Sequence, residues 1–335
     1  MNDVRRTLHE TRHRPLRRTL RRGVALVATL SLLLAACGDA NAPAAAPDQD
    51  APDLSIAVAS FDVHVGDDQR LLAGVFTPDR SLLGFGEVTF QLGHVDPGQP
   101  DQVALPQQTT ARWLGVPGME PSGPADAPRL LAGEQGSGVY AARVTLDSPG
   151  TWALLVTAEV DGEILEGQTV FTVLEEPLVP NVGDPAPRTG NLTITDVEAG
   201  RVAAHAVDSR ARAEDPTIPD LHLHDTVIAD ALDEGRPVVV VVATPVYCVS
   251  RFCGPLTEVI ADVADRHADR AAFVHLEVWH DFDEGELNDA AAAWIQTEIG
   301  GNEPWVFLVG SDGTIVARWD NVLDVEALED ALASL

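Results

Sequence analysis

The sequence predicts two folded domains, an all-β sandwich followed by an α/β fold. In the first, apolar and polar residues alternate along several short segments, with the period of half-buried strands. In the second, the uninterrupted apolar run 237–242 precedes a segment with apolar residues at helical spacing. The proline-rich stretch 175–187 separates the two patterns. With 335 residues, 45% of them hydrophobic, the chain is long enough for two domains, each with its own core.

Residues 1–36 are predicted to be a signal peptide. This segment contains eight arginines and only two acidic residues, although the whole chain has a net charge of −30. The apolar run 23–36 is shorter than the ~20 residues that span a bilayer. It leads into Leu34-Ala35-Ala36-Cys37, which resembles a bacterial lipobox. The resemblance implies acylation of Cys37 and a lipid anchor on the extracytoplasmic face of the cell membrane. An ordinary signal peptide with a chance cysteine, or an uncleaved anchor, is the alternative.

Residues 37–53 are predicted to be a flexible linker behind that anchor. They consist of small, proline, acidic and amide residues after the cysteine, so they cannot form a core. The acidic balance of the chain also argues against a nucleic-acid partner, because binding phosphates needs surplus cations. The three cysteines are too few for a disulfide-rich scaffold or a multi-cysteine zinc protein.

The first domain, 54–176, is expected to be an immunoglobulin-like sandwich of six or seven short strands. Asp161-Gly162 is a strong hairpin signal between two of them. The stretch 138–152, with its Gly-x-Tyr and Pro-Gly-x-Trp sequences, resembles the YtkA-like/FixH-like extracytoplasmic sandwiches. We expect His64 and His94 to be surface residues. The strands are expected at 54–59, 71–76, 87–92, 140–146 and 152–160, and a further strand after Gly162 is expected to end at Val173.

After an extension, 177–218, the second domain is expected to cover 219–335. Its predicted order is helix, strand, helix, strand, helix, two strands and a closing helix. A buried strand precedes Cys248 and Cys253, and the next helix should begin near the second cysteine, because residues five apart cannot share a helix face. The predicted elements are 226–234, 237–242, 255–267, 272–279, 287–298, 305–309, 314–319 and 325–334.

This order, with the cysteines at the strand-to-helix junction, resembles thioredoxin. The sequences at 183–187 and 305–316 resemble the entry and the last hairpin of exported TlpA/ResA-like redoxins. The resemblance implies a thioredoxin-like fold, a disulfide between Cys248 and Cys253, and a cis peptide bond before Pro304. It further implies a thiol–disulfide oxidoreductase that acts on cysteine-containing exported proteins and a membrane exchange partner, without a cofactor. Beside the cysteines, Tyr247 takes the aromatic position, and Arg251 could lower a thiol pKa.

Two departures keep other functions open. The cysteines are spaced C-x4-C instead of C-x-x-C, and Val242 stands where thioredoxins carry a buried aspartate. An inert disulfide in a non-catalytic interaction module is therefore one alternative. A copper-delivery protein similar to the Sco family is another, with histidines as additional ligands, although we assign no metal site from the sequence. The histidines in question are His222, His224, His275 and His280.

The lipobox resemblance predicts that Cys37→Ala prevents anchoring. The variant should be released from the membrane or remain unprocessed, because the acylated thiol is missing. Membrane fractionation and the mass of the mature N-terminus measure this. Unchanged processing together with unchanged membrane retention would contradict the prediction.

Overall fold

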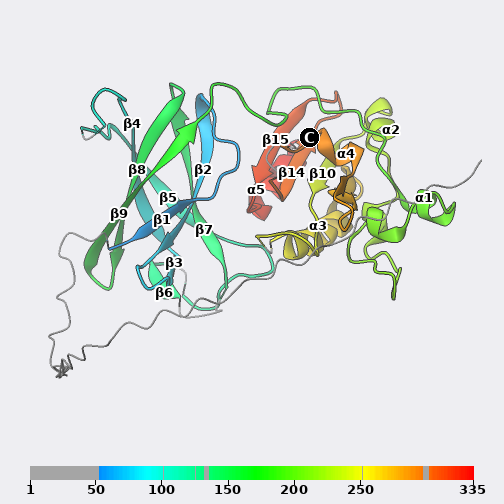
Figure 1. Ribbon diagram of the computed structural model, residues 1–335, viewed down its shortest axis with the longest axis horizontal. Coiled ribbons are helices and arrows are strands. Elements are labelled where there is room, and N and C mark those ends of the chain that lie inside the picture. Colours follow the sequence, from blue (N-terminus) through cyan, green and yellow to red (C-terminus); the bar gives the residue numbers. More distant parts are fainter. Residues whose placement is uncertain (1–52, 101, 125, 132–135, 251, 297–301) are drawn as a thin grey trace, which may run out of the picture. The chain divides into compact units, whose positions relative to one another are not determined.

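The computed structural model describes residues 53–100, 102–124, 126–131, 136–250, 252–296 and 302–335 (Figure 1). The predicted signal peptide, Cys37 with nearly all of the predicted linker, and Arg251 lie outside the described residues. The chain divides into residues 1–49 and one compact unit, Asp50–Leu335. Among the described residues, no helix is both long enough and apolar enough to cross a membrane.

The first nine strands form one sheet in the order β6-β3-β2-β7-β5-β4-β8-β9, with β1 paired to β2. All pairs in this sheet are antiparallel. The strands are β1 (Ser55–Val58), β2 (Gly66–Phe76), β3 (Leu82–Gly84), β4 (Glu87–His94), β5 (Gln107–Gly115), β6 (Arg129–Leu131), β7 (Gly138–Leu146), β8 (Gly150–Val160) and β9 (Glu163–Val173).

Alternation of side chains explains the longer strands of this sheet. Every second residue of β7 from Tyr140, and of β8 from Trp152, is buried in one apolar core. Asp161 and Gly162 join β8 to β9, and both have a positive φ, as a tight hairpin turn of the I′ type requires. Of the two histidines expected at the surface, His94 is exposed, but His64 is buried.

The prediction of an immunoglobulin-like sandwich is wrong, because the strands form one nine-stranded sheet instead of two facing sheets. Strand β5 explains the difference. Its first residues, Gln107–Arg112, pair with β4, while Arg112–Gly115 pair with β7. This one strand therefore joins the two groups of strands. Alternation along a strand shows which side chains are buried, but it does not show which strands pair.

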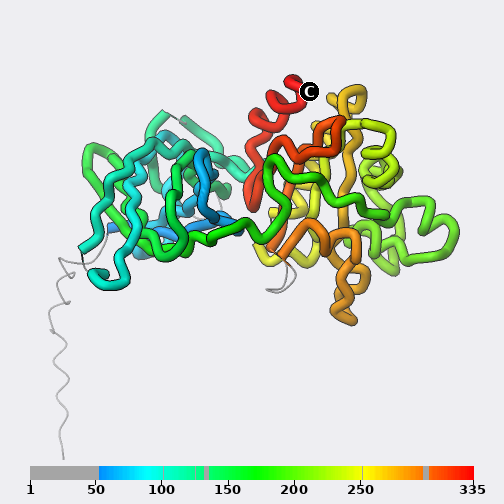
Figure 2. Tube along the Cα trace, turned by 90° about the horizontal axis from the view of Figure 1, so that it is seen from above, coloured from blue at the N-terminus to red at the C-terminus, as the bar shows by residue number. Residues whose placement is uncertain are grey.

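The C-terminal part contains a four-stranded sheet in the order β11-β10-β14-β15 (Figure 2, yellow to red). Strand β10 is parallel to β11 and antiparallel to β14. The elements are α1 (Ile194–Glu198), α2 (Ile228–Asp233), β10 (Val238–Val242), α3 (Cys253–His267), β11 (Ala272–Leu276), β12 (Trp279–Asp281), β13 (Glu286–Leu287), α4 (Asp289–Ala292), β14 (Trp305–Val309), β15 (Ile315–Asp320) and α5 (Val325–Ala333).

Strand β10 is buried on both faces. Its five valines are 0% exposed, which agrees with the uninterrupted apolar run in the sequence. Val238, Val240 and Val242 pack into one apolar cluster with residues of α2 and Trp294. The alternate valines face a second cluster, to which α3 and α5 contribute.

The prediction of an α/β thioredoxin-like fold is also wrong as a fold class. The described residues are mostly β, with fifteen strands and five α-helices, three of which have six residues or fewer. Of the predicted helix 287–298, the described residues 287–296 contain only the four-residue α4, and a small β12-β13 hairpin interrupts the region between β11 and α4. The spacing of apolar residues indicated which side of this segment is buried. A segment of about twelve residues, even if rich in alanine, forms a stable helix only when tertiary packing supports it.

The segment between the two sheets also folds. It contains α1 and two short 3₁₀ helices, η1 (Ala204–Ala206) and η2 (Leu221–Leu223). α1 and η1 contribute to a small apolar cluster that includes Val207 and Ile218, whereas Leu223 of η2 packs in the cluster that contains α3. We expected residues 177–218 to be a linker or extension. In the structure this region includes the buried polar residues Asp208 and Ser209, which support the site described below.

Removing two methyl groups from the centre of β10 tests the importance of its burial. Val240→Ala should lower the free energy of unfolding by about 2–3 kcal/mol, since it loses apolar burial and leaves a cavity. The matched control is Val316→Ala on β15, where the side chain is 42% exposed and the loss should stay within about 0.5 kcal/mol. Denaturant unfolding of both variants measures the difference, and equal losses would contradict the argument.

Candidate functional site

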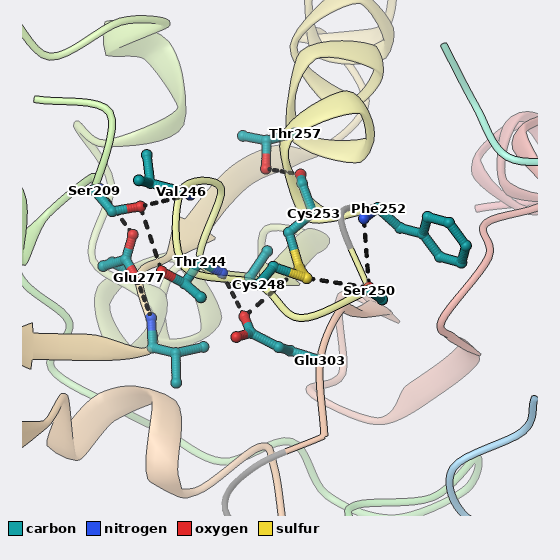
Figure 3. The surroundings of a disulfide bond; sticks show 12 residues. Ser209, Thr244, Val246, Cys248, Ser250, Phe252, Cys253, Thr257, Glu277 and Glu303 are labelled. Carbon is teal, nitrogen blue, oxygen red and sulfur yellow. Dashed lines mark hydrogen bonds between the residues drawn. A yellow bond between two sulfur atoms is a disulfide. The ribbon is translucent and has the colours of Figure 1, made fainter. Parts of the chain in front are cut away.

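The structure joins Cys248 and Cys253 in a disulfide, with 6.1 Å between the two Cα atoms (Figure 3). Cys248 lies in the loop that follows β10, and Cys253 is the first residue of α3. Pro255 stands in the first turn of this helix, where a missing N–H costs no hydrogen bond. The helix begins where the sequence predicted it.

The two sulfur atoms belong to residues with different exposure. Cys253 is 0% exposed, whereas Cys248 is only partly buried. The residues on either side of Cys248 are open to solvent, with Tyr247 39% and Val249 99% exposed. Cys248 is therefore the half of the disulfide that an external thiol can reach. Ser250 Oγ lies 3.1 Å from Cys248 Sγ, so its hydroxyl can donate a hydrogen bond to this sulfur.

Glu303 is the third chemical group of the site. Its Oε2 atom lies 3.7 Å from Cys253 Sγ, on the buried side of the disulfide. The same oxygen accepts a hydrogen bond from the backbone N–H of Thr244. Burial, together with the negative charge of Glu277, raises the pKa of Glu303 to about 8. The carboxyl group is consequently protonated at neutral pH, unlike an ordinary glutamate.

Strand pairing brings Glu303 to this place. In the antiparallel pair of β10 and β14, Val242 lies opposite Trp305. The residues just after β10 therefore face those just before β14, which are Glu303 and Pro304. The peptide bond between them is cis, as the sequence analysis expected. Glu303 precedes β14 and lies 50 residues after Cys253 in the sequence, which is why spacing around the cysteines did not find it.

A second layer of hydrogen bonds holds the loop after β10 (Figure 3). Ser209 Oγ lies 3.3 Å from Thr244 Oγ1 and accepts a hydrogen bond from the N–H of Val246. The N–H of Ser209 donates in turn to Glu277 Oε2 at 2.8 Å. Burial raises the pKa of Glu277. These contacts fix the backbone of Thr244, whose N–H binds Glu303.

The structure brings together only some of the residues that the sequence proposed. Cys248 and Cys253 meet at the site, and Pro304 directly follows Glu303 in the chain, whereas Tyr247 stacks on Phe282 with 3.9 Å between ring centres. Arg251 lies outside the described residues. Among the described residues, the third potential metal ligand beside the two sulfurs is Glu303, and no histidine belongs to this group. His224 and His275 belong to a separate buried cluster.

No protein-family model and no curated protein matches the chain. The geometry of the site defines the chemistry that it can perform. It contains a disulfide with one accessible sulfur and a carboxyl group that can exchange a proton with the other sulfur near neutral pH.

The raised pKa of Glu303 predicts a pH-dependent stability. The unfolded chain releases this proton near the ordinary pKa of 4.5, but the folded protein keeps it up to about pH 8. The folded state therefore binds more protons in this window, and the free energy of unfolding should fall as the pH rises, by about 1.4 kcal/mol per pH unit.

Glu303→Gln should remove this contribution, so its stability relative to the original chain should increase from about pH 5 to pH 8. Glu284→Gln, at an exposed position, is the matched control and should follow the original chain throughout. Denaturant unfolding of the oxidised proteins at several pH values measures this. A constant difference between Glu303→Gln and the original chain would show that Glu303 is ionised in the folded state.

Proposed function

We propose that the protein is a thiol–disulfide oxidoreductase that uses the Cys248–Cys253 pair. The observation that carries the proposal is the unequal exposure of the two cysteines, combined with the Glu303 carboxyl group beside the buried one. An exchange reaction needs one accessible sulfur for the partner and one enclosed sulfur to complete the cycle. Both are present within six residues of the chain.

In the oxidising direction, a substrate thiolate attacks Cys248 Sγ. A bond forms between the substrate sulfur and Cys248, the Cys248–Cys253 bond breaks, and Cys253 leaves as a thiolate. The protonated Glu303, 3.7 Å away, can give its proton to this sulfur. A second substrate thiolate then attacks the substrate sulfur of the mixed disulfide and releases Cys248. Two substrate thiols are oxidised and the cysteine pair is reduced.

The reducing direction uses the same groups in reverse. Cys248 thiolate attacks a substrate disulfide and forms the mixed disulfide, and the first substrate sulfur leaves. Cys253 loses its proton to the Glu303 carboxylate and attacks Cys248 Sγ, which releases the second substrate thiolate. A carboxyl group with a pKa near 8 is suited to both tasks, because it takes up and gives back a proton close to neutral pH.

We further propose that this reaction takes place outside the cytoplasm at the membrane, on cysteines of exported proteins. The support is the lipobox-like sequence at Cys37 and the linker that follows it. A disulfide also persists in extracytoplasmic compartments, whereas cytosolic thiols are kept reduced. A membrane exchange partner would restore the redox state of the pair after each turnover.

Trapping the mixed disulfide tests the proposal. In a Cys37→Ser background, only Cys248 and Cys253 carry thiols. The reduced Cys253→Ser variant should form a stable mixed disulfide with glutathione when it is mixed with glutathione disulfide, because no resolving thiol remains. Cys248→Ser should react far more slowly, since its remaining thiol is 0% exposed. Mass spectrometry over time measures both reactions.

The same variants unfolded in urea provide the control for intrinsic thiol reactivity. Faster trapping at Cys253 than at Cys248 would reverse the assigned roles. If neither folded variant reacts faster than its unfolded form, the pair is an inert structural disulfide and the oxidoreductase proposal fails.

A further inference from the structure

A second group of chemically active side chains lies in the interior, separate from the disulfide. Asp208 follows η1, His224 follows η2, and His275 lies on β11. All three side chains are 0% exposed. Their ligand atoms lie within 4.8 Å of one another. Three segments that are far apart in the sequence thus place two imidazoles and a carboxylate around one point.

The histidines of this cluster have unused ring nitrogens. Within the described part of the chain, Nδ1 of His224 makes no hydrogen bond, whereas Nε2 of His224 and Nδ1 of His275 face Asp208 Oδ2 without the geometry of a hydrogen bond. Buried polar atoms nearly always have a partner, so three ring nitrogens without a well-formed hydrogen bond at one place require an explanation. A bound ion would supply the missing partner.

The hydrogen bond of His275 fixes which of its nitrogens is free. Its Nε2 lies 2.9 Å from the carbonyl oxygen of Ala243, which can only accept. Nε2 therefore carries the proton and donates it, and Nδ1 faces Asp208 Oδ2 at 3.6 Å. Metal-binding histidines typically donate their other ring N–H to a carboxylate or a backbone carbonyl in this way.

We propose that Asp208, His224 and His275 bind a divalent first-row transition metal such as Zn²⁺. Two imidazole nitrogens and one carboxylate oxygen suit this class of ion. Ligand atoms of a tetrahedral zinc ion, each about 2 Å from the metal, lie roughly 3.3–3.5 Å from one another. Asp208 Oδ2 lies 3.2 Å from His224 Nε2 and 3.6 Å from His275 Nδ1. Two of the three distances between ligand atoms thus match a tetrahedral site, and the third is below 4.8 Å.

Burial and mutual contacts shift the proton affinities of all three members of the cluster. Burial opposes the charge of Asp208, but contacts with His224, His275 and Arg210 outweigh it and hold the pKa of this carboxyl well below its usual range. Burial lowers the pKa of His224, so its ring is neutral. The pKa of His275 is raised, because Asp208 and Glu277 outweigh the effect of burial. A metal would take the place of the proton that His275 holds against Asp208.

Arg210 already binds the Asp208 carboxylate and would share it with the metal. Its Nη2 lies 2.7 Å from Asp208 Oδ2, and its Nε lies 3.1 Å from Oδ1. The guanidinium also pairs with Asp220 at 2.9 Å, which keeps it in place when it shares Oδ2 with a metal. Arg210 thus contacts both oxygens of Asp208, including the one that would bind the metal, and hydrogen bonds of this kind orient a ligating carboxylate.

The ion would act as a clamp behind the disulfide site. It would join the segments that carry η1 and η2 to β11, next to Ser209, which binds Glu277 and contacts Thr244. Because the cluster is enclosed, the ion would support the fold of this region instead of meeting substrate. The proposal does not depend on the redox activity of the cysteines.

Metal binding by the full chain provides the test. The oxidised Cys37→Ser protein, stripped with a chelator, is titrated with Co²⁺ and, separately, with Zn²⁺. We expect one equivalent of Co²⁺ with the visible absorption of a four-coordinate site, and a thermal midpoint that rises with the Zn²⁺ concentration. The oxidised disulfide leaves no thiolate for the metal, so a signal cannot come from the cysteines.

His224→Gln should weaken Co²⁺ binding by more than the roughly 10–100-fold typical for outer-shell partners. His222→Gln, two residues away with a 41% exposed side chain, is the matched control and should bind like the original chain. The metal-dependent thermal shift of the original chain does not rely on any variant folding. Absence of a stoichiometric cobalt spectrum and of a zinc-dependent shift would overturn the proposal and leave an internal ion pair of protonated His275 with Asp208.

Discussion

The pairing of β10 with its two neighbours is the constraint on which the site depends. β10 is enclosed on both faces and bonded along both edges, so the positions at which β11 and β14 begin and end relative to it are fixed. Residues just beyond its end therefore meet those beyond the end of β11 and those before β14. In this way Thr244, Glu277 and Glu303 converge, although they lie 33 and 26 residues apart along the chain.

Burial of ionisable groups at this end of the sheet gives them unusual proton affinities. Removing a carboxyl group from water disfavours its charged form, and a neighbouring negative charge adds to this effect. Glu303 experiences both, because it is enclosed and has Glu277 nearby. Asp208 is buried as well, but its contacts with His224, His275 and Arg210 favour the charged form. At neutral pH the buried Glu303 is therefore protonated, whereas the buried Asp208 is ionised.

The nine-stranded sheet shows how pairing can override an expectation based on periodicity. The alternation of Tyr140, Ala142 and Val144 identifies buried positions, and all of them are in the core. Whether such strands form one sheet or two depends on a strand such as β5, which changes partner at Arg112. The hydrogen bonds that decide this involve the backbone, which is the same for every residue type. The pattern of side chains therefore carries little information about it.

The sequence by itself determined the local features of this protein: most strands, the β8-β9 turn at Asp161-Gly162, the buried run of β10 and the start of α3 near Cys253. Each of these depends on neighbouring residues, through alternation, turn chemistry or the chain geometry of proline. Only the tertiary structure decided that the first nine strands share one sheet, that several predicted helices are short, and that Glu303 lies beside Cys253. It also placed Asp208, His224 and His275 around one point. These features depend on contacts between residues far apart in the sequence, such as Gly66 with Leu146 and Asp208 with His275, which are set by strand register and burial and leave no local signal.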